Sequence, residues 1–244
     1  MADRREITMP IRYYKDYKGG YDYGYEDLAL PLDACAFLLV DVDGGYSVES
    51  GGQAHPTTRD FIVPALEAAR RAGLLVAYVH NDLRLVADEG NIAGEVWGKT
   101  KTPQGGAYLE AWRKRGDYAP TYHPCVAPRP DERNFPKWMW SGFRDTFLDQ
   151  HLRSHGIQTL FAVGYSRRAC LHYTCAEAIG RNYRVILLRD CSNPPGEIEM
   201  PDTLDESLPE GGWVNRIMLR QFEHLIGYTT TSAEFVDACG AITQ

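Results

Sequence analysis

Two side chains capable of nucleophilic and acid–base chemistry follow apolar runs of the sequence. Asp41 comes directly after residues 36–40, and Cys170 lies six residues after Gly164, near the start of a predicted helix. A thiol near a helix N-terminus meets the positive end of the helix dipole and unpaired backbone N–H groups, which favour the thiolate and can hold an oxyanion. Cys170 is therefore the candidate nucleophile; the alternative is a small core residue that packs the helix on a sheet.

A lysine among aromatic residues is the third candidate. Lys137 lies just ahead of a helix that we expect to begin near Ser141. Apolar surroundings can lower the pKa of a lysine, and an ammonium beside a thiol lowers the pKa of that thiol. The alternative is a solvated surface lysine whose stem covers the neighbouring tryptophans.

The segments that must position these residues alternate between buried strands and amphipathic helices. Apolar runs predict strands at 36–40, 74–79, 159–163, 185–188 and 228–231, and periodicity predicts helices at 57–72, 143–156, 168–182, 213–226 and from Ser232 onward. Strands that are apolar on both faces and alternate with helices indicate a parallel sheet covered on both sides. We predict an α/β fold: a three-layer α/β/α domain with a mostly parallel central sheet. Ligands of such sheets bind beyond the carboxyl ends of the strands, where Asp41 and Cys170 fall.

Two regions depart from this regular pattern. Residues 1–33 are rich in tyrosine and glycine and show neither helical nor strand period, which predicts an N-terminal arm that packs on its own domain or on a neighbouring subunit. Residues 34–244 form one domain. Within it, residues from about 81 to 136 are rich in glycine, proline and charge, and their length predicts a lid or a set of binding loops.

Composition narrows the functional class. The chain has 26 lysines and arginines against 33 aspartates and glutamates, a formal net charge of −7, which argues against a nucleic-acid partner bound through bulk positive charge. Neither a membrane-spanning apolar run nor a secretory signal is present in the sequence, so we expect a cytoplasmic protein with no membrane partner. Its 6 cysteines are scattered without a C-x-x-C pair, which predicts mostly free thiols.

Three segments together resemble a known family. Residues 37–41 resemble the first strand of the isochorismatase-like cysteine hydrolases, a family that includes nicotinamidases, N-carbamoylsarcosine amidohydrolases and ureidoacrylate amidohydrolases. The pattern Lys-x-x-x-Ser-Gly-Phe at 137–143 is similar to the lysine motif of that family, and residues 164–170 resemble its nucleophile loop. The resemblance spans roughly residues 34–240, with the motifs in the expected order and spacing.

The resemblance implies a catalytic triad. Cys170 would be the nucleophile, Asp41 the base that takes its proton, and Lys137 the cation that poises the pair. The oxyanion hole would consist of the backbone N–H groups of Ser166 and Cys170. By the same similarity, the peptide bond between Tyr165 and Ser166 would be a non-prolyl cis bond.

The implied reaction is hydrolysis of a C–N bond in a small amide, carbamoyl or ureido compound, through a thioester and with release of ammonia. It needs no cofactor, and the family resemblance together with the arm suggests a homodimer or homotetramer. Two alternatives remain: vinyl-ether hydrolysis of the isochorismatase type, and a non-catalytic small-molecule binder or scaffold with the same fold. Titration of the Cys170 thiol would help to separate the binder from the hydrolase.

One departure from the family pattern concerns substrate binding. Arg167 and Arg168 replace the usual Thr-Asn pair before the nucleophile. Two guanidinium groups can bind a substrate carboxylate in a bidentate manner, as a carbamoyl or ureido acid would need. The alternative is that one or both form structural ion pairs with acidic residues such as Asp190.

A second departure concerns metal binding. Many members of the family carry Asp-x-His after the second strand as metal ligands, and the positions aligned here are Asn81 and Leu83. Leucine cannot bind zinc, so we predict no metal. A shifted alignment would make His80 and Asp82 the ligands; otherwise His80 is a polar residue of the substrate pocket or a strand-end histidine.

Aromatic residues are expected to wall the pocket. Tyr46, Trp138, Trp140 and the loop at 94–136 would enclose a small planar substrate and exclude water. Aromatic residues at these positions are equally compatible with a core or a subunit interface.

Overall fold

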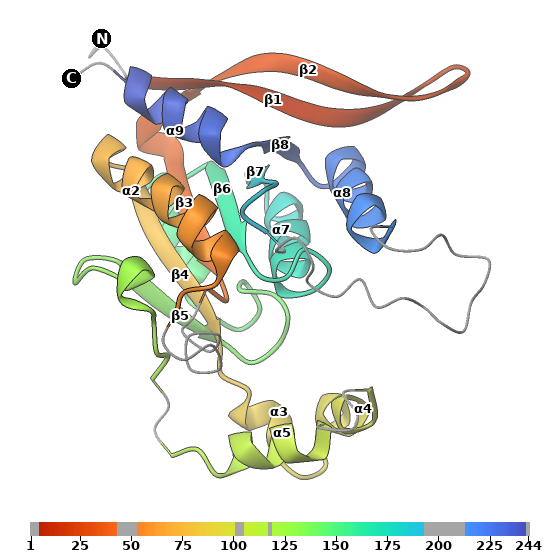
Figure 1. Ribbon diagram of the computed structural model, residues 1–244. Coiled ribbons are helices and arrows are strands. Elements are labelled where there is room, and N and C mark those ends of the chain that lie inside the picture. The colour runs from red at the N-terminus through yellow and green to blue at the C-terminus, as the bar shows by residue number, and fades with distance from the viewer. Residues whose placement is uncertain (1–4, 43–52, 101–104, 117–118, 193–212, 243–244) are drawn as a thin grey trace.

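The computed structural model describes residues 5–42, 53–100, 105–116, 119–192 and 213–242 (Figure 1). The strands are β1 (Glu6–Tyr17), β2 (Gly20–Pro31), β3 (Cys35–Val40), β4 (Leu75–Asn81), β5 (Arg133–Lys137), β6 (Thr159–Gly164), β7 (Arg184–Leu188) and β8 (Tyr228–Thr230). The helices are α2 (Val63–Ala72), α3 (Arg84–Ala87), α4 (Ile92–Thr100), α5 (Gly105–Arg113), α6 (Leu148–Ser154), α7 (Cys170–Gly180), α8 (Trp213–Leu225) and α9 (Ser232–Ala241), and a π-helical turn η2 (Thr58–Ile62) precedes α2.

One sheet organises the described residues. Its strand order is β2-β1-β8-β7-β6-β3-β4-β5. The strands from β8 to β5 run parallel, and β1 pairs antiparallel with both β2 and β8. Helices α2 and α9 cover one face of the sheet, while α7 and α8 cover the other (Figure 1). The predicted fold class, a three-layer α/β/α domain with a mostly parallel sheet, is confirmed.

The central strand β3 shows why the sheet needs cover on both faces. All of its residues are buried, and successive side chains of a strand point to opposite faces. Phe37 and Leu39 belong to the core under α2 and α9, whereas Leu38 and Val40 belong to the core under α6 and α7. A continuous apolar run is therefore the pattern that a doubly covered strand requires.

The N-terminal residues differ from the prediction, because β1 and β2 form a long hairpin within the main sheet. Ile7, Met9 and Ile11 are buried, and they alternate with exposed residues at the period of a strand. The other half of the hairpin is solvated, with Tyr17 and Tyr21 more than half exposed. The prediction that this segment has no strand period was therefore wrong. The alternation was missed because it is short and is followed by a tyrosine-rich tip.

The segment expected to be a lid or loops contains three short α-helices in its described part. Helices α3, α4 and α5 form a helical lobe (residues 84–100 and 105–113) that follows the carboxyl end of β4 and lies at the bottom of Figure 1. The core of the lobe contains Leu83, Val86, Ala87, Trp97, Leu109 and Trp112. The lobe thus has its own small apolar core.

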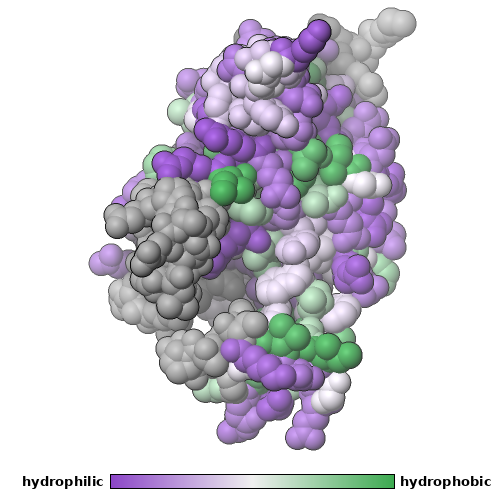
Figure 2. Space-filling model, turned by 90° about the vertical axis from the view of Figure 1, so that its right-hand side faces the viewer, coloured by the Kyte–Doolittle hydropathy of each residue, from purple (hydrophilic) through white to green (hydrophobic). Residues whose placement is uncertain are grey.

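The face drawn in Figure 2 is mainly hydrophilic over its coloured part. On the face drawn in Figure 2, apolar side chains form small separate patches, one of them over the helical lobe at the bottom of the view. Ile92 and Val96 of α4 are 75% and 48% exposed there. Among the described residues, every helix is too short or too polar to cross a lipid bilayer.

Candidate active site

The carboxyl ends of neighbouring strands bring the predicted catalytic residues together. Asp41 directly follows β3, Lys137 ends β5, and Cys170 begins α7 shortly after β6. Strands β6, β3, β4 and β5 are consecutive in the sheet and run parallel, so their carboxyl ends lie side by side at the same end of the sheet. The structure therefore places all three members of the predicted triad at the edge where parallel sheets bind ligands.

The backbone turns sharply at Asp41. Its φ is 52°, in the left-handed region that non-glycine residues rarely adopt, and its N–H donates to the carbonyl of Val79 at 2.8 Å. The ends of β3 and β6 approach each other closely here, because a Cβ placed on Gly164 would lie only 2.0 Å from the carbonyl oxygen of Val40. This close approach explains the glycine at the end of β6, and the strained Asp41 backbone is of the kind that clusters at functional sites.

Lys137 is fully buried at this edge. Its Nζ lies 3.0 Å from Oδ2 of Asp41 and donates a hydrogen bond to Oδ1 of Asn81. Burial alone opposes the charged ammonium, but the neighbouring Asp41 carboxylate and Cys170 outweigh it and raise the pKa of Lys137. The surface alternative for this lysine is wrong. Its position just ahead of a helix is also wrong, because Lys137 ends a strand and α6 begins only at Leu148.

The residues after Lys137 have packing roles. Gly142 lies against β4, where an added Cβ would meet a methyl group of Val79 at 2.8 Å, and its N–H donates to Oγ1 of Thr174 on α7. Ser141 is buried, and its Oγ accepts from the N–H of Phe143. The Ser-Gly-Phe part of the motif therefore fits the turn tightly between β4 and the nucleophile helix.

Cys170 is the first residue of α7 and only 6% exposed. Burial, together with the negative charge of Asp41, raises the pKa of the thiol to about 12 even though Lys137 acts in the opposite direction. The sequence favoured a thiolate at rest, and this expectation differs from the structure, in which the thiol is buried and faces the carboxylate of Asp41. A proton acceptor is therefore needed to form the nucleophile.

Asp41 is placed to accept that proton. Both of its carboxylate oxygens are buried, and neither accepts a well-aligned hydrogen bond from the described residues, although Lys137 provides an ion pair at 3.0 Å. A buried carboxylate usually fills its lone pairs with donors. Here the lone pairs remain available for a proton from the thiol.

The loop before Cys170 presents backbone donors. The peptide bond between Tyr165 and Ser166 is cis, as the resemblance implies. The carbonyl of Ser166 accepts from the N–H groups of Ala169 and Leu171, whereas the N–H groups of Ser166 and Cys170 donate to no backbone carbonyl of the described residues. Backbone N–H groups without a carbonyl partner, in the loop that leads to the thiol, are the kind of donor that an oxyanion hole requires.

The candidate metal-binding positions have other partners. His80 is buried with its Nδ1 3.3 Å from Oδ1 of Asn134, and burial lowers its pKa. Asp82 accepts bidentate hydrogen bonds from the guanidinium of Arg84. Leu83 is buried in the core of the helical lobe. The described part of the chain brings no three His, Cys, Asp or Glu side chains together as metal ligands.

The structure separates the two arginines before the nucleophile. Arg167 is buried and donates to Oγ and the carbonyl of Ser192 and to the carbonyl of Arg189, in the loop after β7. Asp190 accepts instead from Ser232. Arg168 is exposed. Substrate binding by these arginines stays a prediction, and only Arg168 reaches solvent with most of its side chain.

The aromatic residues predicted to wall the pocket differ in their surroundings. Trp140 is half-buried and contacts both the core that contains Cys170 and the core of the helical lobe; its ring centroid lies 4.4 Å from that of Trp97. Trp138 is half-buried, and its Nε1 donates to Asp145. Tyr46 lies outside the described residues. Trp140 thus joins the catalytic edge to the lobe.

Sequence reasoning missed the role of one residue. Asn81 entered only as an aligned metal position, yet its Oδ1 accepts from Lys137 and lies 4.0 Å from Sγ of Cys170. Its place just after a predicted strand was the only signal in the sequence, because the register that sets Asn81 beside Lys137 is seen only in the structure.

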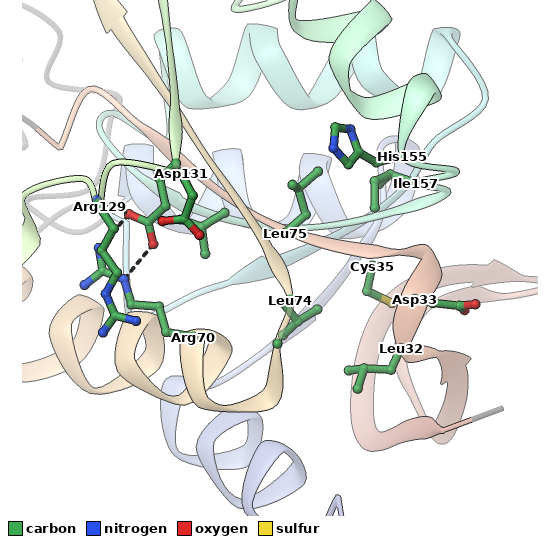
Figure 3. A pocket seen from close by; sticks show the side chains of 13 residues that line it. Leu32, Asp33, Cys35, Arg70, Leu74, Leu75, Arg129, Asp131, His155 and Ile157 are labelled. Carbon is green, nitrogen blue, oxygen red and sulfur yellow. Dashed lines mark hydrogen bonds and ion pairs between the residues drawn. The ribbon is translucent and has the colours of Figure 1, made fainter. Parts of the chain in front are cut away.

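A cavity lies at the opposite end of the sheet from the candidate active site. It has a volume of about 390 Å³ and is lined by residues at the amino ends of β3 and β4, by Arg70 of α2 and by Glu132 (Figure 3). Arg70 donates to both carboxylate oxygens of Glu132 and to Glu67. No member of the triad lines this cavity.

The family model of the isochorismatase domain matches residues 35–197. The ureidoacrylate amidohydrolase RutB of Methylorubrum extorquens is 28% identical over 227 residues, which cover 86% of this chain and 84% of that protein. RutB of Agrobacterium fabrum is 27% identical over 241 residues, covering 90% and 94% of the two chains.

Solved structures share the fold. A cysteine hydrolase from Pseudomonas syringae pv. phaseolicola superposes with a TM-score of 0.64 at 23% identity, covering 88% of this chain and 96% of its own. The N-carbamoylsarcosine amidase from Thermoplasma acidophilum gives a TM-score of 0.54 at 22% identity, covering 82% and 97%. These similarities concern the architecture that carries the triad.

Proposed function

Since the chain belongs to the isochorismatase domain family, we propose that it is a cysteine-dependent amidohydrolase. It cleaves a C–N bond of a small amide, carbamoyl or ureido compound through a thioester intermediate and releases ammonia. The observation that carries this proposal is the buried Asp41–Lys137 ion pair beside Cys170 at the start of α7. Ureidoacrylate amidohydrolases among the relatives support the class of substrate.

The first half of the reaction forms the thioester. Asp41 takes the proton of the Cys170 thiol as the sulfur adds to the substrate carbonyl, and Lys137 balances the negative charge as it moves between carboxylate and sulfur. The backbone N–H groups of Ser166 and Cys170 hold the oxyanion. Protonated Asp41 then gives its proton to the departing nitrogen, the C–N bond breaks, and the acyl group remains on sulfur.

The second half releases the acid. Asp41, again a carboxylate, takes a proton from water, and the hydroxide adds to the thioester carbonyl. The C–S bond breaks, and the Cys170 sulfur leaves and recovers a proton from Asp41. The raised pKa of Cys170 suits this cycle, because the thiol is the resting form and Asp41 must act in each half.

Ammonia release from a panel of substrates tests the proposal. The panel contains small amides, ureido acids, carbamoyl amino acids, biuret and nicotinamide, and the protein is treated with a chelator first. We expect activity in the wild type and its loss in Cys170→Ala. Cys175→Ala is the matched control, since Cys175 is a buried cysteine on the same helix with no contact to Asp41 or Lys137 among those described, and it should retain activity. Equal activity in Cys170→Ala and the wild type would refute the cysteine mechanism.

A further inference from the structure

We propose that Asn81 determines specificity by donating a hydrogen bond from its side-chain nitrogen to a second acceptor oxygen of the substrate, beside the carbonyl that Cys170 attacks. The inference rests on the proposed function for the identity of the attacked carbonyl. Its substrate class is amides and ureas that carry a carboxylate or carbonyl oxygen close to the scissile bond.

The orientation of the Asn81 amide follows from its neighbour. A lysine ammonium has only donors, so the atom of Asn81 that faces Lys137 must be the oxygen Oδ1. Lys137 is itself fully buried and held by the ion pair with Asp41, so this contact is fixed. A flipped amide would place two donors against each other in a dry site, at a large cost.

The same contact directs the nitrogen Nδ2 away from Lys137. Nδ2 has no acceptor among the described residues, and Asn81 is half-buried. The adjacent polar residues on the chain are already engaged, His80 with Asn134 and Asp82 with Arg84. Asn81 therefore leaves a donor at the end of β4 that lacks a protein acceptor.

That donor lies close to the reacting sulfur. Oδ1 is 4.0 Å from Sγ of Cys170, and both polar atoms belong to one small planar amide, so Nδ2 also lies within a few ångströms of the sulfur. A substrate bonded to Sγ brings its neighbouring groups within reach. A positioned donor discriminates strongly against analogues without an acceptor, because it is then left unpaired.

Three related substrates test the inference. N-Carbamoylglycine, N-carbamoylglycinamide and ethylurea share the urea group and offer a carboxylate oxygen, a carbonyl oxygen and no second oxygen, respectively. Kinetics are measured for the wild type, Asn81→Leu, Asn81→Asp and the control Asn134→Asp. Asn81→Asp keeps an oxygen against Lys137 but removes the donor, which separates the two roles of the amide. Asn134 is a partly buried amide on the neighbouring strand that contacts no triad residue.

We expect kcat/KM for N-carbamoylglycine and for N-carbamoylglycinamide, each relative to ethylurea, to fall about tenfold to hundredfold in both Asn81 variants. The Asn134→Asp control should leave this ratio unchanged. The neutral N-carbamoylglycinamide shows whether the loss in Asn81→Asp exceeds simple charge repulsion. An equal loss for all three substrates would mean that Asn81 only holds Lys137, and it would overturn the inference.

Binding measurements separate this inference from the proposed function. Calorimetry compares N-carbamoylglycine with ethylurea on the wild type and Asn81→Leu. If the wild type turns over none of the compounds but binds N-carbamoylglycine in an Asn81-dependent manner, the proposed function fails and the role of Asn81 stands. Turnover without any Asn81-dependent preference retains the proposed function and refutes the role. Absence of both turnover and Asn81-dependent binding refutes both.

Discussion

At the carboxyl ends of the strands, the buried carboxylate of Asp41 has an ion pair with Lys137 but accepts no well-aligned hydrogen bond from the described residues. At the amino ends, the buried carboxylate of Glu132 accepts three hydrogen bonds, two from Arg70 and one from the N–H of Arg129. Arg70 also donates to Tyr78 and to the carbonyl of Ala127.

The two carboxylates therefore differ in what they can still do. A carboxylate whose lone pairs are filled by fixed donors stabilises the fold and is a poor proton acceptor. Asp41 has lone pairs to spare and a thiol beside it. Similar burial at the two ends of one sheet thus accompanies a structural role for Glu132 and, in the proposed function, proton transfer by Asp41.

Asp41→Asn should have the largest effect on activity. The amide cannot take the proton of Cys170 or deliver it to the leaving nitrogen, so we expect kcat to fall by about a thousandfold. Ammonia release measures the loss, and circular dichroism checks that the variant is folded. Activity within tenfold of the wild type would assign the proton to a different base.

Glu132→Gln should lower the stability of the fold and leave kcat unchanged, the opposite of what we expect for Asp41→Asn. The amide nitrogen would face the guanidinium of Arg70 and break a buried ion pair, so the free energy of unfolding should fall by about 3 kcal/mol. Urea unfolding measures it. Asp131→Asn, at the exposed neighbouring position, is the control and should change stability by less than about 0.5 kcal/mol. A loss of kcat per folded molecule in Glu132→Gln would contradict the purely structural role of Glu132.

Alkylation of Cys170 should be faster in Asp41→Asn than in the wild type. Asp41 raises the pKa of the thiol and Lys137 lowers it, so removing the carboxylate lowers the pKa. We expect up to about a tenfold faster reaction with iodoacetamide near pH 8, because one pKa unit changes the thiolate fraction by that factor. Mass spectrometry of the Cys170 peptide gives the rate. Slower alkylation in the variant would contradict the assigned charge interaction.

The smallest expected effect is on acid stability. The hydrogen bonds from Arg70 and the N–H of Arg129 hold the pKa of Glu132 below its usual value against the opposing effect of burial. A lowered pKa in the folded state contributes stability above the unfolded pKa, and this contribution is lost as the pH falls through the folded value. The stability difference between the wild type and Glu132→Gln should therefore shrink below about pH 4.5. Urea unfolding over a pH series measures this, and a constant difference would refute it.

The sequence predicted the parallel core well because each central strand is buried on both faces and so reads as a continuous apolar run. Strand β5 escaped prediction, since Arg133–Lys137 is short, contains a proline and lies at the edge of the sheet. The hairpin escaped because its clear alternation covers only the half that packs on the core. Edge elements bury less apolar area and leave weaker patterns.

For the site, residue types and motif order indicated Asp41, Lys137 and Cys170. Their charge states were not predictable, because the pKa of Cys170 depends on how completely the site excludes water. The contact of Asn81 with Lys137 was also out of reach, because it depends on the register of β4 against β5. Spacing along the chain does not contain such distances between strands.

The aromatic junction between the helical lobe and the catalytic edge has a practical consequence. The chain has 5 tryptophans, and four of them, Trp97, Trp112, Trp138 and Trp140, lie in the lobe core or pack against it. The fifth, Trp213, begins α8. Intrinsic fluorescence is therefore weighted toward the lobe and the adjoining catalytic edge, with the Trp97–Trp140 pair at its centre. We expect ligand binding at Cys170 to change this emission, which would allow binding to be measured without a dye, a label or a coupled assay.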